Sequence, residues 1–218
     1  MAQSLSQTRS REQEAIAALL LLESRSRRGL TSALALSLSL DAPDALKAAA
    51  ITSISRQALT KVRKLGRQAA SSFYEVPPEV EELALETGDA SAVMDATAVD
   101  LAAANMTKRW ATAVVEARAN GSPEWVAQSE GRSALAKSAE MTASYEALSA
   151  MSDETSRVGI LAHRAGYKVV STWQAALDKQ TCDKCDHLDG EERTFPDEFD
   201  ALPPIHNRCR CHILTDVS

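Results

Sequence analysis

Four cysteines, all that the chain contains, lie close together near its C-terminus. Cys182 and Cys185 form a C-x-x-C pair, Cys209 and Cys211 form a C-x-C pair, and His206 lies three residues before Cys209. Two close pairs separated by a loop are typical of a tetrahedral metal site, because each pair supplies two ligands from one turn. The spacing therefore predicts a structural zinc site.

Two alternatives to zinc are disulfides and reduced thiols. Disulfides are typical of small secreted domains, but the apolar run at residues 15–22 is short and is followed by Glu23 and Arg25, so it is a poor secretion signal. A metal also suits this segment, because its many Asp, Glu, Pro and Gly residues leave little apolar surface to bury. Structural zinc contributes on the order of 10 kcal/mol to small sites at neutral pH.

The candidate ligands outnumber the four positions of a tetrahedral shell. The four cysteines alone fill it. A Cys3His shell that includes His206 is the alternative, because the two cysteines of a C-x-C pair can bind the same tetrahedral ion only in a constrained geometry. His187 and His212 are weaker candidates. A shell filled by protein leaves no position for water, which argues against catalysis.

The segments W-Q-A-A-L-D-K-Q-T-C-D-K-C-x-x-L-D-G and L-P-P-I-H-N-R-C-R-C resemble the C-terminal module of the phage Mu F-like head morphogenesis family of minor head proteins. The resemblance covers residues 165–215, and Asn207 stands where the family often has proline. The matching positions are Trp173, Asp178, Thr181, Cys182, Cys185, Leu188, Gly190, Pro204, His206, Cys209, Arg210 and Cys211.

The resemblance implies a structural protein of the phage head. Its implied partners are the portal protein, capsid or scaffold proteins and, without sequence specificity, double-stranded DNA. Its implied place is the virion, in the capsid interior or near the portal, after assembly in the host cytoplasm. The remaining, helical part of the chain carries no motif that adds to the resemblance.

Composition predicts a mainly α protein with an Ala-rich helical body and a small C-terminal α+β module of short strands, stabilised by zinc. Hydrophobic residues make up 44% of the chain but aromatic residues only 4%, which favours slim, closely packed helices. Three regions are expected: a basic helical region at 1–75, a helical body at 76–165 and a metal-binding β module at 166–218. No uncharged apolar stretch reaches the length of a membrane-spanning helix.

Proline, glycine and capping residues predict the helix boundaries. We expect helices at 44–73, 79–86 and 90–119, then a helix from 124 that Gly131 interrupts, and a last helix at 153–165 after a cap at Ser152. Residues 30–40 are expected to be helical, although their alternating leucines also fit a strand. Trp125 is expected to pack, and one face of the first long helix is expected to be buried through Leu46, Ala50, Ile54, Ala58, Val62 and Leu65.

Beyond Gly166 the residues favour strands, which we expect at 167–177, 191–195 and 210–214. His163, just before this region, is expected at the surface or in packing and not as a ligand. The small core around the metal is expected to comprise Val170, Trp173, Leu188, Phe195, Leu202 and Ile213.

The charges are distributed unevenly along the chain. Residues 1–70 contain eleven Lys or Arg against five Asp or Glu, whereas the whole chain has a net charge of −6. A basic end predicts a contact with phosphate or with an acidic protein face, and a solvated helix surface explains it equally well. The candidate phosphate contacts are Arg25, Arg27, Arg28, Lys61, Arg63, Lys64 and Arg67.

No catalytic residue is predicted. A metal-dependent nuclease is one alternative function, but no second histidine or carboxylate stands at a suitable spacing for a catalytic ion, and the cysteines would occupy the metal. A zinc adaptor protein unrelated to phage is another. The chain contains no nucleophile elbow, phosphate loop or dinucleotide motif.

Overall fold

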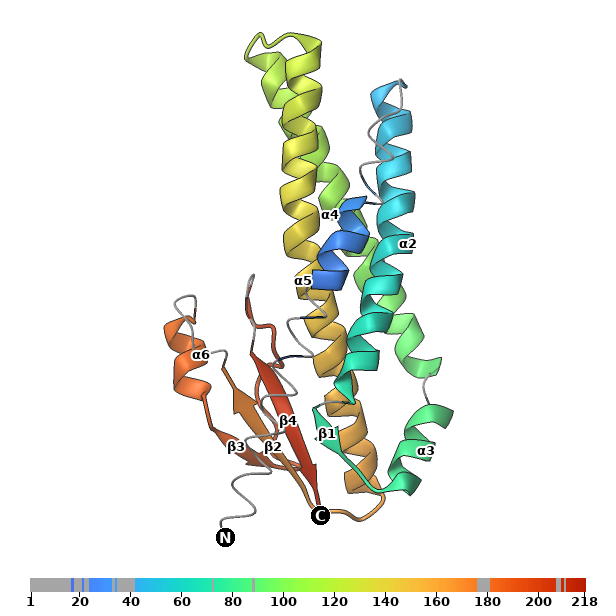
Figure 1. The fold of residues 1–218 in the computed structure, drawn as a ribbon, viewed down its shortest axis with the longest axis vertical. Helices are drawn as coiled ribbons and strands as arrows, with labels where there is room; N and C mark the ends of the chain where they lie inside the picture. The colour runs from blue at the N-terminus through green and yellow to red at the C-terminus, as the bar shows by residue number, and fades with distance from the viewer. Residues whose placement is uncertain are drawn as a thin grey trace.

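Three long helices form the body of the molecule: α2 (Asp44–Ala70), α4 (Asp89–Ala119) and α5 (Glu124–Arg164) (Figure 1). All three pack on one another, and α5 also contacts the strands that follow it. The predicted class, mainly α with short strands near the C-terminus, is confirmed. The computed structural model describes residues 17, 21, 24–32, 34, 42–71, 73–87, 89–175, 181–206, 209 and 211–218.

Helix α2 begins after Pro43 and carries Asp44 in its first turn and Arg67 in its last, so both charges complement the helix dipole. Its buried face agrees with the predicted one at Ala58 and Val62, and the predicted positions Ala50, Ile54 and Leu65 are partly buried. Leu46 was expected to be buried but is 61% exposed. The fully buried stripe starts at Ile51, which was not predicted, and continues seven and eleven residues later at the predicted Ala58 and Val62.

Helix α5 is continuous, so the predicted interruption at Gly131 and the predicted cap at Ser152 are both wrong. Gly131 lies where α5 crosses α4. A Cβ at this position would lie 2.5 Å from Val114 Cγ2 and 2.9 Å from Trp110 Nε1, so the glycine permits close packing within an intact helix. Ser152 is buried inside the helix, where packing outweighs the preference of serine for a helix start.

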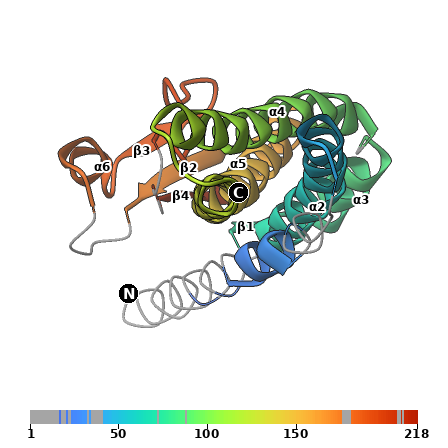
Figure 2. The same cartoon turned by 90° about the horizontal axis from the view of Figure 1, so that it is seen from above.

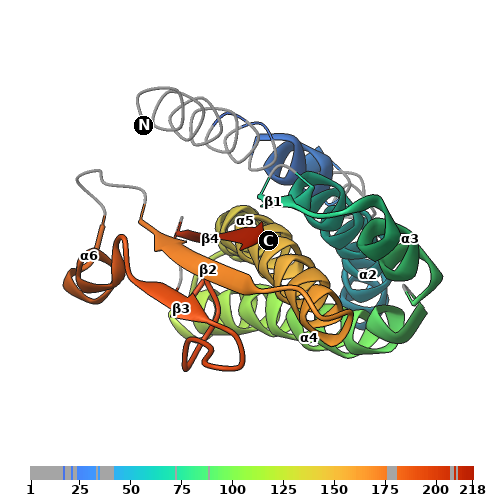
Figure 3. The ribbon, with the colours of Figure 1, turned by 90° about the horizontal axis from the view of Figure 1, so that it is seen from below.

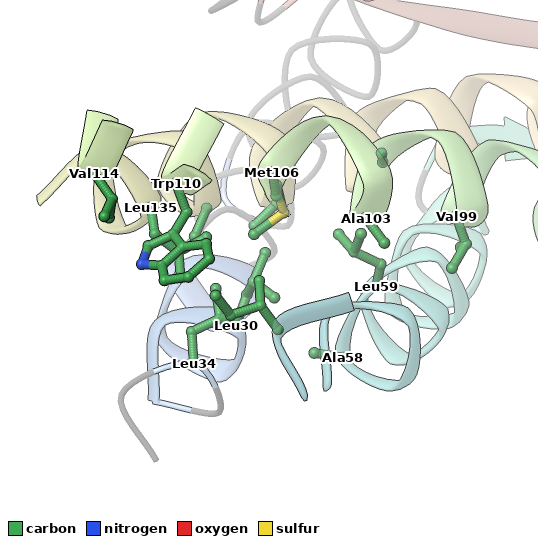
Figure 4. Packing of buried hydrophobic residues seen from close by; sticks show 14 of the residues in the cluster. Leu30, Leu34, Ala58, Leu59, Val99, Ala103, Met106, Trp110, Val114 and Leu135 are labelled. Carbon is green, nitrogen blue, oxygen red and sulfur yellow. The ribbon is translucent and has the colours of Figure 1, made fainter. Parts of the chain in front are cut away.

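The core between the long helices is built around Trp110 and Met106 of α4 (Figure 4). Leu30, from the helical residues 24–32, closes one side, and residues 35–40 of the expected helix lie outside the described residues. Trp125 does not join this core. It is 73% exposed, contrary to the prediction, because it lies in the first turn of α5 at the end of the bundle.

The C-terminal sheet has four strands in the order β1-β4-β2-β3. Strand β2 pairs antiparallel with β3 and β4, which correspond to the three predicted strands, and β1 pairs parallel with β4. Strand β1 was not predicted, because two residues are too short to show a periodicity. The bounds are β1 Tyr74–Glu75, β2 Val169–Gln174, β3 Glu192–Thr194 and β4 His212–Val217.

The sheet and α6 (Asp183–Leu188) lie on one side of α5, and α2 and α3 (Pro78–Glu86) lie on the other (Figures 2 and 3). A buried cluster joins sheet and bundle: Phe73, after α2, packs with Leu148 of α5 and Leu214 of β4. The N–H of Thr215 donates to the carbonyl of Phe73 at 2.9 Å. Side chains from all three regions expected from the sequence thus share this cluster.

From the sequence, no membrane-spanning helix was expected. Among the described residues, no helix is both long enough and apolar enough to cross a bilayer.

Candidate metal centre

The cysteines and His206 are positioned by α6 and by the loop that leads into β4. Cys182 lies just before α6 and accepts a 2.9 Å hydrogen bond at its carbonyl from the N–H of Asp186, while Cys185 lies in the first turn. On the other side, the N–H of Cys209 donates to the carbonyl of His206 at 3.1 Å. The two cysteine pairs, separated by more than twenty residues of sequence, therefore meet.

The five donor atoms form two groups that share Cys185. Cys182, Cys185 and His206 form one group, and Cys185, Cys209 and Cys211 form the other; within each group the donor atoms lie within 4.8 Å of one another. His206 Nε2 lies 3.0 Å from Cys182 Sγ and 3.3 Å from Cys185 Sγ. Cys185 Sγ lies 3.8 Å from Cys209 Sγ, and all four cysteines are free.

These distances fit a metal better than a disulfide. A disulfide requires about 2.0 Å between sulfurs. Zn–S bonds of about 2.3 Å in a tetrahedron place two sulfurs about 3.8 Å apart, which is the separation of Cys185 and Cys209. Thiolates and imidazole are the donors that zinc prefers in structural sites. Each of the two groups could therefore hold a metal ion, and their donor types suit zinc.

In each cysteine pair, the pKa of one thiol is lowered and that of the other is raised. A hydrogen bond from the backbone at Cys185 lowers the pKa of Cys182, and a hydrogen bond with the Cys211 thiol lowers the pKa of Cys209 to about 5. Burial raises the pKa of Cys185 to about 12, and the hydrogen bond with Cys209 raises the pKa of Cys211. A divalent cation would favour the thiolate form of the remaining ligands as well.

A small hydrophobic cluster surrounds the sulfurs. Trp173 and Ile213 are buried beside Cys185, Cys209 and Cys211, and Leu188 and Leu202 pack against them partly buried. The rings of Trp173 and Phe199 meet edge to face at 5.4 Å, a favourable aromatic geometry.

Two of the six residues expected in this small core lie elsewhere. Phe195 packs against the cluster of α3, α5 and β2 and contacts the ring of His163 at 4.3 Å, so His163 is a packing residue. Val170 is partly exposed and lies outside the cluster around the sulfurs. Of the weaker ligand candidates, His187 is exposed on α6, and His212 is buried with its ring 4.8 Å from that of Phe73.

The candidate phosphate contacts occupy different environments. Arg25, Arg28, Lys61 and Lys64 are exposed. Arg27 donates to Ser144 Oγ at 2.9 Å and to Glu140 at 3.2 Å, and Arg67 pairs with Asp95.

Arg63 lies inside the bundle, with 4% of its side chain exposed. It donates to Asp95 at 2.6 Å, to Glu146 at 2.7 Å and to Asp153 at 2.9 Å, and burial raises the pKa of Glu146. Sequence reasoning did not single out these carboxylates. One signal was present, because Arg63 follows the buried Leu59 by four residues and so shares its face.

A family model described as Phage Mu protein F like protein matches residues 92–214, more than half of the chain. The matched region extends from within α4 through α5, β2, α6 and β3 into β4, and it includes all five candidate ligands. Comparisons with curated proteins and with solved structures found no match. The extent of the family match, which includes the Cys/His cluster and most of α4 and all of α5 before it, shows that this chain belongs to the phage Mu F-like family of head morphogenesis proteins.

Proposed function

We propose that this protein is a structural, non-catalytic component of the phage head that binds the portal protein and the inner face of the capsid. The observation that supports this role is the family match over residues 92–214. Helix α5 gives the role a physical basis, because one helix of 41 residues connects the bundle to the Cys/His module. Two surfaces at different ends of a stiff element suit a protein that bridges other head components.

We further propose that the Cys/His cluster holds one structural zinc. The buried sulfurs, the 3.8 Å separation of Cys185 and Cys209 and the imidazole of His206 support this assignment. The ion would fix α6 and the loop before β4 against the sheet, a segment whose small apolar cluster is a weak source of stability. Protein ligands fill the shell, so the ion would have no open position for water.

The fourth ligand is testable because the two candidates lie in different groups. His206→Ala and Cys211→Ser each remove one candidate, and the purified variants are assayed for zinc by mass spectrometry. The variant that retains one zinc per chain identifies the residue that is not a ligand. If neither change alters zinc content, or if the unaltered protein contains none, the proposed site is wrong.

Head association is tested by producing the full chain together with the portal, scaffold and major capsid proteins of the same phage. Heads are isolated on a density gradient and their proteins are quantified. We expect the chain to sediment with heads that contain portal and to be depleted from heads assembled without portal. Complete heads that lack the chain would refute the proposed role.

The exposed residues Arg25, Arg28, Lys61 and Lys64 support a secondary proposal, a contact with packaged DNA that is independent of sequence. Arg63 takes no part in it, because its guanidinium is buried among carboxylates. Such a contact would weaken steeply with salt, since each neutralised phosphate releases counterions.

A further inference from the structure

The surface over α4 and α5 contains two hollows that join into one groove. Their volumes are about 420 and 640 Å³, and both are lined by Asn105, Arg109, Ser138 and Met141. On α4 the lining extends from Ala98 to Glu116, which at 1.5 Å per residue corresponds to about 27 Å, or five helical turns. The groove is therefore long enough for a helix of similar length.

The groove is lined by small residues and a few large apolar ones. Alanines and Ser138 on the two helices allow another backbone to approach closely. Leu101 is 65% exposed at one end, while Met141 and Tyr145 are partly buried and leave apolar surface open to solvent. Flexible methionine and exposed leucine are side chains that commonly receive the apolar face of a partner helix.

The charge around the second hollow is positive, although the whole chain has a net charge of −6. Lys108, Arg109 and Lys137 line it together with one acid, Glu116. Within the described ranges, no ion pair involves these three cations, whereas Arg63 and Arg118 each pair with more than one carboxylate. Cations without carboxylate partners beside exposed apolar side chains favour an occupant that brings its own acids.

We propose that this groove binds an amphipathic α-helix with carboxylate side chains, contributed by another protein of the phage head. A third helix laid between α4 and α5 would place apolar residues on Leu101 and Met141 and acids opposite Lys108, Arg109 and Lys137. The exposed apolar side chains of the groove favour this occupant over nucleic acid, which would meet the cations but leave Leu101 and Met141 uncovered. The inference deepens the proposed function, because it assigns a surface and a partner chemistry to head binding.

The test uses the full chain, produced with the portal, scaffold and major capsid proteins. In Leu101→Asp a carboxylate is placed in the groove, and in Lys108→Glu/Lys137→Glu its charge is reversed. Leu46→Asp is the matched control, because Leu46 lies on α2 and is exposed to nearly the same extent, 61%. We expect both groove variants to reduce the copies of the chain per head by about tenfold or more, and the control to leave them unchanged.

A photo-crosslinking residue at Met141 identifies the occupant. Crosslinks to an acidic helical segment of one head protein support the proposal on one further condition. When the acids of that segment are replaced by Lys, the Lys108→Glu/Lys137→Glu variant must bind that protein again. Crosslinks to a second copy of the chain, to DNA or to a basic segment overturn it. So do unchanged copies per head in both groove variants. If the unaltered chain is itself missing from heads, the proposed function fails together with the groove proposal. If the unaltered chain is present in heads but both groove variants are present at the same level, the groove proposal alone fails.

Discussion

Gly66 is the position where the packing of α2 against α5 is most sensitive to one added carbon. A Cβ there would lie 2.2 Å from the carbonyl oxygen of Ala147, 3.0 Å from its carbon and 3.2 Å from Ala150 Cβ. The nearest atoms belong to backbone and cannot rotate away, so Gly66→Ala requires the two helices to separate. The separation would also lengthen the ion pair between Arg63 and Glu146, now 2.7 Å, one turn away.

Two opposing effects set the magnitude. Alanine in place of glycine stabilises a helix by about 1 kcal/mol, whereas overpacking costs about 1 to 3 kcal/mol and more when backbone must move. These two effects leave a cost of about 0 to 2 kcal/mol. Lengthening the buried ion pair adds about 2 kcal/mol, so we expect Gly66→Ala to lower the free energy of unfolding by about 2 to 4 kcal/mol. Urea unfolding of the full chain, followed by circular dichroism at constant zinc, measures it.

Gly29→Ala is the control for Gly66→Ala. Gly29 is helical and exposed, and no atom lies within 4 Å of its added Cβ. The same substitution should therefore raise the free energy of unfolding by up to about 1 kcal/mol, from helix propensity alone. If Gly66→Ala is as stable as the unaltered protein, or if both variants change in the same direction, the close approach of α2 and α5 is not as described.

Three further predictions concern the metal, the buried charges and the basic residues. Cys185→Ser should abolish binding of about one zinc per chain and disorder the segment after Gly166, while the helical signal changes little; an equal loss of helix would show that bundle and module depend on one another. Arg63→Met should cost about 3 kcal/mol at pH 7 and less at pH 5. Burial already raises the pKa of Glu146, and removal of the guanidinium raises it further, so the cost is full above that folded-state pKa and shrinks as protonation neutralises the carboxylate; a cost independent of pH would refute this account. Arg25→Ala/Arg28→Ala should weaken salt-sensitive binding to random duplex DNA, measured by fluorescence anisotropy, whereas the control Lys184→Ala on α6 should not. Equal binding by the two variants would mean that Arg25 and Arg28 are solvated surface residues without a role in DNA binding.

The sequence was informative where the decisive contacts are local. Pro43, Pro123 and the Asn120-Gly121 turn mark helix ends that the structure reproduces. The cysteine spacing predicted the cluster because each pair lies within one turn, so two residues of a pair must be neighbours whatever the fold.

The predictions failed where contacts with a distant part of the chain determine the local structure. Gly131 was interpreted as a break because its local propensity is poor, but Trp110 and Val114 of α4 require its small size. Arg63 was interpreted as a surface cation, yet its partners lie 32, 83 and 90 residues further along the chain. No short window along the sequence contains these partners, so the ion pairs of Arg63 could not be derived from its neighbours in sequence.

The pairing of Tyr74–Glu75 with β4 has a consequence for dividing the molecule. The family similarity begins at residue 92, yet the strand that shields the outer side of β4 precedes that point, and β4 itself continues to Val217. A fragment cut to the limits of similarity would present an uncovered strand border, and such borders recruit other chains into intermolecular sheets. The segment that matches the family is therefore shorter than the smallest fragment of this protein that would fold with its sheet complete.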